Sequence, residues 1–136
     1  MQSTAPTTPI SKPMLWTGYV ISALPVLMLL ASAVMKFARP GFVVEGMEKH
    51  GYPETMLVGL GIVELACTVI YLIPQTSVLG AILLTGYLGG ATATHVRVGE
   101  LSQAFSGPIL VGVLVWLGLF FRDPRVRTLI PLRRNL

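Results

Sequence analysis

Charged side chains are scarce in this sequence. They make up 12% of the 136 residues, whereas 53% are hydrophobic and the mean hydropathy is +0.72. An ordinary soluble domain carries about 25% charged residues, because its surface must meet water. The shortage excludes a water-soluble globule of this size, and it indicates that most apolar side chains face lipid or other helices.

Cysteine, histidine and the usual cofactor motifs are also in short supply. The single cysteine, Cys67, cannot form an internal disulfide, and no Cys-x-x-Cys pair is present. The chain has no glycine-rich phosphate loop, no His-Glu-x-x-His motif and no histidine pair four residues apart. Its two histidines, His50 and His95, are too few for the usual bis-haem arrangement. We therefore expect no metal site and no intrinsic cofactor.

The sequence has four long apolar runs instead. They lie at about residues 14–35, 55–73, 78–96 and 105–121. Spanning a bilayer takes roughly 20 predominantly apolar residues, which the first three runs supply. The fourth run is short unless Phe105 and its neighbours extend it. The pattern predicts an all-α fold, a four-transmembrane-helix bundle, with the integral membrane domain over residues 14–121.

The segments around these runs are polar. Residues 1–13 are rich in Thr and Pro and predict a disordered leader. The apolar run that follows is longer than the h-region of a signal peptide, which has about 7–15 residues, so we expect a retained helix. Residues 36–54 predict a surface loop, either irregular or folded as a short helix on the membrane surface. Residues 122–136 form a basic tail.

The basic residues suggest how the chain lies in a membrane. The formal net charge is +4, and the tail contains Arg122, Arg125, Arg127, Arg133 and Arg134. Directly after an apolar helix, such a patch indicates an anionic lipid surface rather than nucleic acid. With both termini inside, six basic residues lie on the inner side and four on the outer side, as the positive-inside rule favours. We expect a multi-pass protein of the cell membrane with cytoplasmic N- and C-termini.

Two features of the apolar runs bear on function. Gly86 and Gly90 lie four residues apart in the third run, and small residues at this spacing let another helix approach closely. They predict tight packing, with self-association or contact with other membrane subunits. Glu64 lies in the middle of the second run, where an ionised carboxylate costs several kcal/mol. It should face the bundle and be protonated or paired, either as a proton, quinone or ligand contact or as a structural hydrogen bond.

Depth in the membrane suggests which residues lie near Glu64. Tyr87 is at the midpoint of the third run, so we predict a Glu64–Tyr87 contact, with Thr85 as a weaker candidate. Lys36, at the end of the first run, is about nine residues of depth away, or roughly 14 Å at 1.5 Å per residue. A direct Lys36–Glu64 ion pair is therefore not expected without a kink. His95 and Arg97 lie at the same end, and His95 is either a ligand or proton group or an interfacial residue.

Several short motifs together resemble one family. They are Lys36-Phe37, Gly51-Tyr52-Pro53, Leu60-Gly61-x-x-Glu64-Leu65, Leu72-Ile73-Pro74, and Gly86 through His95 followed by Gly99-Glu100. Over about residues 15–121 the chain resembles the DoxX-like membrane proteins. The resemblance implies a four-helix bundle, and it implies association with quinol-linked or sulfur-oxidising respiratory complexes, or other membrane oxidoreductase assemblies, as a small subunit. It also favours Glu64 and His95 as site residues.

Three functions remain open at this point. The leading hypothesis is an accessory, non-catalytic subunit of a quinone-linked membrane redox assembly, with quinone contacting the groove at Glu64 and Tyr87. The others are a proton-coupled small-molecule carrier that uses Glu64, and a membrane assembly factor that binds other helices. No inverted repeat is visible, which counts against a transporter.

Overall fold

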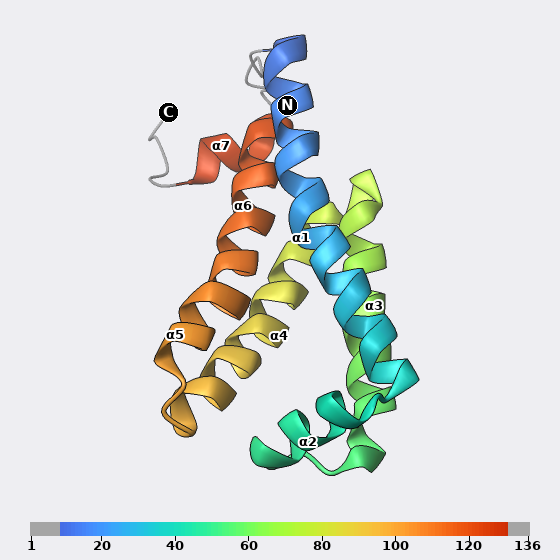
Figure 1. Ribbon diagram of the computed structural model, residues 1–136. Coiled ribbons are helices and arrows are strands. Elements are labelled where there is room, and N and C mark those ends of the chain that lie inside the picture. The colour runs from blue at the N-terminus through green and yellow to red at the C-terminus, as the bar shows by residue number, and fades with distance from the viewer. Residues whose placement is uncertain (1–8, 131–136) are drawn as a thin grey trace, which may run out of the picture.

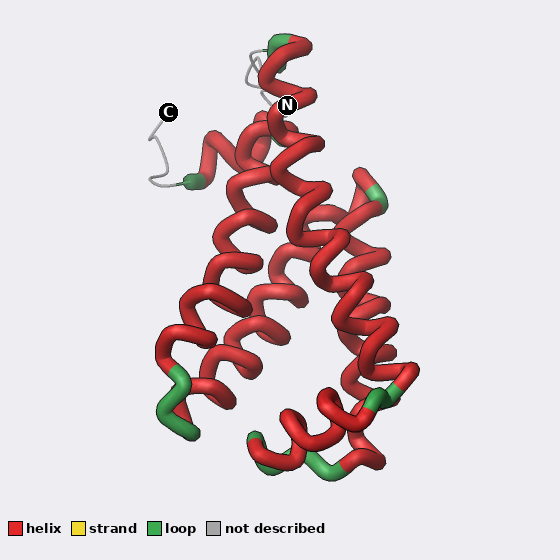
Figure 2. Tube along the Cα trace, in the orientation of Figure 1, coloured by secondary structure: helices red, strands yellow, loops and turns green. Residues whose placement is uncertain are grey.

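The computed structural model describes residues 9–130, and this part of the chain contains helices and connecting turns but no strand (Figures 1 and 2). Four of its helical segments are long and apolar enough to cross a membrane: Lys12–Ala38, Glu54–Leu72, Pro74–Arg97 and Leu101–Arg122. The predicted all-α, four-helix membrane fold is therefore confirmed. The large apolar side chains left exposed on these helices are the ones that a bilayer would cover.

The elements follow one another with short connections. They are α1 (Lys12–Ala38), α2 (Gly41–Lys49), a 3-10 turn (Glu54–Met56), α3 (Leu57–Leu72), a second 3-10 turn (Pro74–Thr76), α4 (Ser77–Arg97), α5 (Leu101–Ala104), a π-helical turn (Phe105–Ile109), α6 (Leu110–Arg122) and α7 (Pro124–Leu129). The fourth span is thus extended at its start by α5 and the π-helical turn. The start of α1 and the end of α6 lie at the same end of the bundle (Figure 1).

Outside the predicted spans, the chain is more helical than its composition indicates. The expected surface loop at 36–54 contains α2, which has no buried residue and lies across the end of the bundle (Figure 1). Within the predicted leader, Lys12 and Pro13 already belong to α1, while residues 1–8 lie outside the described part. Within the predicted basic tail, Arg122 still belongs to α6, and α7 follows; the carboxylate of its N-cap, Asp123, accepts from the backbone N–H of Arg125. Residues 131–136 lie outside the described part.

The turn between α1 and α2 is fixed by two adjacent residues. Arg39 ends α1 in the left-handed conformation, with a φ of 52°. Pro40 follows as the N-cap of α2 in an extended conformation. Proline disfavours a helical conformation in the residue before it, so α1 cannot continue through this pair. The chain therefore turns at Arg39 and places α2 across the bundle end.

Small residues bring α1 and α6 together at the end where α1 begins. A Cβ added at Gly18 would lie 2.8 Å from the Cβ of Arg122, and one added at Gly118 would lie 2.9 Å from the backbone nitrogen of Ser22. On the other side of the bundle, a Cβ at Gly80 would collide with the backbone of Tyr71. Only glycine permits these approaches, which gain van der Waals contact between helices. We call this region the close-packed end.

Tyr71 is the central side chain of the close-packed end. It is fully buried, and its hydroxyl donates to the Val115 carbonyl at 2.8 Å and lies within hydrogen-bond distance of the Ser22 hydroxyl, at 3.2 Å. The guanidinium of Arg122 lies 4.8 Å from the centre of its ring. One side chain of α3 thereby joins α1 and α6 through polar contacts in an otherwise apolar core.

Gly86 and Gly90 do not make the tight helix–helix contact that was predicted for them. No atom lies within 4 Å of a Cβ added at either position, so they do not bring α4 against another helix within the described chain. The close approach of α3 and α4 occurs instead at Gly80, one turn into α4. The expectation was wrong because the small-residue spacing alone cannot tell which of several glycines faces the neighbouring helix. Self-association through Gly86 and Gly90 stays a prediction.

Candidate functional site

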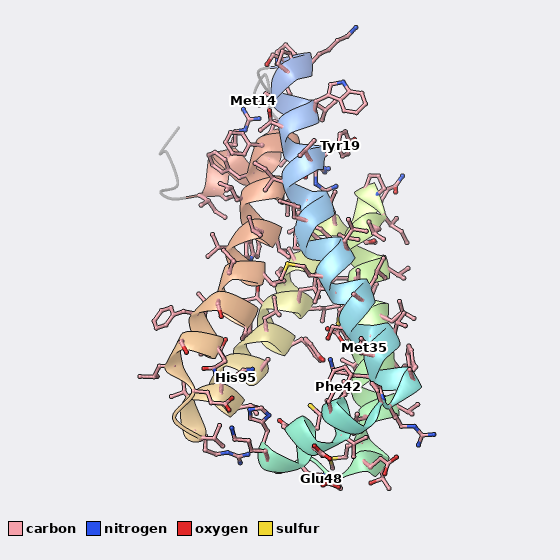
Figure 3. The ribbon with its side chains drawn as sticks, in the orientation of Figure 1. Met14, Tyr19, Met35, Phe42, Glu48 and His95 are labelled. Carbon is pink, nitrogen blue, oxygen red and sulfur yellow. The ribbon has the colours of Figure 1, made fainter. Side chains whose placement is uncertain are left out.

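The helices diverge away from the close-packed end and enclose a cavity. Its volume is about 690 Å³, and we call it the α1–α4 cavity. Apolar side chains form most of its surface, and its polar lining comprises Ser32, Lys36, His50, Tyr52, Glu64, Tyr87, Thr94 and His95. In Figure 3, Phe42 on α2 and His95 on α4 mark two of its sides. Four of the six predicted site residues line it, namely Lys36, Glu64, Tyr87 and His95.

A buried ion pair lies in the wall of the α1–α4 cavity. Glu64 is 2% exposed, and its Oε2 accepts from Lys36 Nζ at 2.9 Å and from Ser32 Oγ at 3.2 Å. Lys36 Nζ also donates to Ser32 Oγ at 2.6 Å. Glu64 thus faces the bundle and is paired, as expected of a carboxylate at this depth. The expectation that no direct Lys36–Glu64 pair forms was wrong.

The approach of α1 to Gly61 explains the ion pair. A Cβ added at Gly61 would lie 3.2 Å from the Cβ of Lys36, so Lys36 packs at the level of Gly61. Glu64 is only three residues further along α3, less than one helical turn of 5.4 Å. The depth estimate failed because it placed Lys36 at the level of the helix ends, whereas α1 crosses α3 well inside them.

The other two predicted neighbours of Glu64 lie apart from each other. Tyr87 and Glu64 both line the α1–α4 cavity, and the predicted Glu64–Tyr87 contact stays a prediction. Thr85 faces the opposite side of α4, where its Oγ1 accepts from Trp116 Nε1 at 2.7 Å. The side chains that donate to the Glu64 carboxylate, Ser32 and Lys36, come from α1 rather than from α4.

A second polar cluster lies at the end of the cavity covered by α2. Glu100 Oε2 accepts from His50 Nε2 at 2.8 Å and from His95 Nδ1 at 2.9 Å, while its Oε1 accepts from Lys49 Nζ at 2.6 Å. The two imidazole rings are 4.8 Å apart between centroids. Lys49, followed by the two histidines, lowers the pKa of Glu100 to about 2, because each of them donates a hydrogen bond to the carboxylate. We call this set the His–Glu cluster.

Two glycine turns bring the His–Glu cluster together. Gly99 has a φ of 82°, which reverses the chain after α4, and the Glu100 N–H donates to the His95 carbonyl at 2.9 Å. Gly51 has a φ of 88° after α2, and Arg97 donates through Nη2 to the His50 carbonyl. Arg97 therefore tethers the end of α2 and stays outside the cavity lining. Glu100 was quoted in the sequence motifs but not predicted as a site residue, and the pairing of His50 with His95 was not predicted; the glycine directly before Glu100 was the available signal.

The family of the chain follows from a family model that matches residues 20–118. This chain belongs to the DoxX-like family. The matched segment contains Lys36, Glu64, Tyr87 and the whole His–Glu cluster, and it confirms the resemblance read from the motifs. No curated protein matches the chain, nor does any solved structure.

This DoxX-like protein has a further groove, between α4 and α6. Its volume is about 590 Å³, and the lining includes Thr85, Gly89, Trp116 and Phe120 but no titratable side chain. The polar surface in it is minor, and the Thr85–Trp116 hydrogen bond is made within its wall. Of the two hollows beside α4, the α1–α4 cavity therefore contains the titratable groups, and the α4–α6 groove is apolar.

Proposed function

We propose that this DoxX-like protein is an accessory subunit of a membrane redox assembly and binds the head group of a quinone in the α1–α4 cavity. The observation that carries the proposal is a mainly apolar cavity with the buried Lys36–Glu64 pair in its wall. Ligand sites generally combine an apolar lining with a few polar groups that fix orientation, in a volume of about 300–1,000 Å³. The α1–α4 cavity meets this description.

The polar groups match a ring that carries oxygen on two sides. The carbonyl oxygens of a quinone accept hydrogen bonds, and Lys36, Tyr52 and Tyr87 offer donors in the lining. The hydroxyls of the reduced quinol donate, and the Glu64 carboxylate accepts. One cavity could therefore hold both redox states with their polar atoms paired.

An accessory role follows from what the reaction needs. Reduction of a quinone to a quinol takes up two electrons and two protons. In this proposal the electrons come from a partner subunit, and this chain supplies the binding cavity and hydrogen bonds. Gly86 and Gly90 line the cavity, so their open surface would receive the ring rather than a second helix. With cytoplasmic termini, as the basic residues predict, the His–Glu cluster would face the opposite side of the membrane.

A pair of adjacent glycines provides the test. Gly90 lines the α1–α4 cavity and Gly89 lines the α4–α6 groove, and a Cβ at either meets no atom within 4 Å. Gly90→Phe should fill the cavity, while Gly89→Phe adds the same bulk on the other face of α4. Decylubiquinone is titrated into each protein in mild detergent, and thermal unfolding is recorded. Binding at 100 times Kd should stabilise the parent and Gly89→Phe by about 2.7 kcal/mol and leave Gly90→Phe unchanged.

Other outcomes favour the competing functions. If decylubiquinone shifts neither the parent nor Gly89→Phe, or shifts Gly90→Phe equally, quinone does not bind in this cavity. Solute-dependent proton uptake by proteoliposomes, lost in Glu64→Gln, would support a proton-coupled carrier. Stable copurification of a membrane partner by Gly90→Phe as well as by the parent, without any quinone effect, would support an assembly factor.

A further inference from the structure

We propose that His50, His95 and Glu100 bind a divalent transition-metal ion of the zinc type at the α2 end of the α1–α4 cavity. Metal binding at this cluster does not depend on quinone binding, because none of the three residues belongs to the Lys36–Glu64 wall. It also reverses the expectation from the sequence that the chain has no metal site.

The ligand atoms already converge. The imidazole nitrogens and the carboxylate oxygen all lie within 4.8 Å of one another, and Glu100 Oε2 is 2.8 Å and 2.9 Å from the two nitrogens. Zinc binds nitrogen and carboxylate oxygen at about 2.0–2.2 Å, which puts tetrahedral ligand atoms roughly 3.3–3.6 Å apart. Small side-chain movements would therefore open room for an ion between them. Both histidines of the sequence take part.

The donor set is that of a zinc site with an open position. Two imidazoles and one carboxylate supply three protein ligands, which leaves a fourth position for water or another molecule. Both histidines line the α1–α4 cavity, so the open position would face it. Lys49 Nζ donates to the other carboxylate oxygen, Glu100 Oε1, at 2.6 Å, so it leaves Oε2 to the two imidazoles.

The same geometry has a simpler explanation, in which the cluster only fastens α2 to α4. The three ligands come from the end of α2, the end of α4 and the N-cap of α5, so their hydrogen bonds do connect these elements. The two explanations differ at Lys49. Its ammonium contributes to a fastening ion pair, whereas it repels a cation bound at Oε2. Neutralising Lys49 should therefore weaken a fastener but strengthen a metal site.

The experiment uses the full chain, purified in mild detergent with a histidine-free affinity tag and stripped with a chelator. ZnCl₂ is titrated in competition with a chromogenic chelator, and bound zinc is counted by mass spectrometry. We expect one zinc per chain. His50→Gln and His95→Gln each retain an N–H that can donate to Glu100 but are poor ligands, so each should lower zinc affinity by about tenfold or more. Glu45→Gln, an exposed carboxylate of α2, should bind zinc as the parent does.

Lys49→Met provides the decisive comparison, with the exposed Lys12→Met as its control. Zinc affinity should rise about threefold or more in Lys49→Met, because a nearby positive charge is removed, and stay unchanged in Lys12→Met. The proposal is overturned if the parent binds no stoichiometric zinc, if either glutamine variant binds zinc as well as the parent, or if Lys49→Met binds it more weakly. The quinone titration is performed on zinc-free protein, so either proposal can fail without the other.

Discussion

Glycines at the two ends of the bundle have opposite effects on the space around them. At the close-packed end, Gly18, Gly80 and Gly118 each allow a neighbouring helix to come into contact with the backbone. Along the α1–α4 cavity, Gly86 and Gly90 have no neighbouring atom within 4 Å of an added Cβ, and they leave room. A small residue in a membrane helix therefore indicates either close contact or open space, and only the neighbouring helix decides which.

The surroundings of the polar groups also differ between the close-packed end and the α1–α4 cavity. At the close-packed end, the Tyr71 hydroxyl has its partners within hydrogen-bond distance in a fully buried position. Around the cavity, Lys36, Glu64 and Tyr87 belong to the lining, and Lys36 and Glu64 pair with each other there. The close-packed end is joined by buried neutral hydrogen bonds, whereas the cavity is lined by charged and polar side chains. Substitutions at the two ends test this contrast, and their expected effects differ in size.

The largest effect is expected from breaking the buried ion pair. Lys36→Met leaves the Glu64 carboxylate without its cationic partner, which should lower the free energy of unfolding by about 3–5 kcal/mol. Lys36→Met with Glu64→Gln removes both charges and should recover most of this loss. Unfolding in detergent, followed by circular dichroism against denaturant, measures both. A loss below about 0.5 kcal/mol in Lys36→Met would mean that the pair contributes nothing to stability.

The next largest difference is expected from a methyl group added to α4, once at the close-packed end and once beside the cavity. Gly80→Ala forces a Cβ against the Tyr71 backbone and should destabilise the protein by about 1–3 kcal/mol or more, as overpacking does. Gly86→Ala meets open space and should change stability by less than about 1 kcal/mol, because alanine also favours the helix. The same unfolding measurement applies. Equal destabilisation by both variants would show that α4 packs uniformly along its length.

Removing single hydroxyls should have the smallest effect. Tyr71→Phe removes the donor to the buried Val115 carbonyl and the hydrogen-bond partner of Ser22, and should cost about 1 kcal/mol. Tyr52→Phe removes the 3.1 Å hydrogen bond to Thr94 at the half-buried cavity lining, and should cost less than about 0.5 kcal/mol. Thermal unfolding of the two variants side by side measures the difference. A larger loss in Tyr52→Phe would contradict the assignment of Tyr71 as the central side chain of the close-packed end.

Apolar composition was enough to predict the spans and the burial of Glu64. A carboxylate inside an apolar run must turn away from lipid, and Glu64 does so. Its partner was not predictable in this way, because the Lys36–Glu64 distance depends on where α1 crosses α3. That crossing is set by the contact at Gly61, which no periodicity in the sequence reveals.

The His–Glu cluster shows a second limit of sequence reasoning. His50 and His95 are 45 positions apart, and they meet only because α2 folds back across the end of α4. The backbone conformations that allow this belong to Arg39, Gly51 and Gly99, each with a positive φ. Two of the three are glycines and could have been marked as turns. Which side chains the turns bring together depends on packing in three dimensions.

The helices α1 and α6 are in close contact at Ser22 and Gly118, so a tilt of α1 about this contact would displace its far end. Fourteen residues separate Ser22 from Lys36, about 21 Å of helix at 1.5 Å per residue. A rotation of only about 5° about this fulcrum would swing Lys36 by about 2 Å. A displacement of that size separates a hydrogen-bonded ammonium and carboxylate. A change of tilt of that size between α1 and α3 would therefore be enough to break the ion pair.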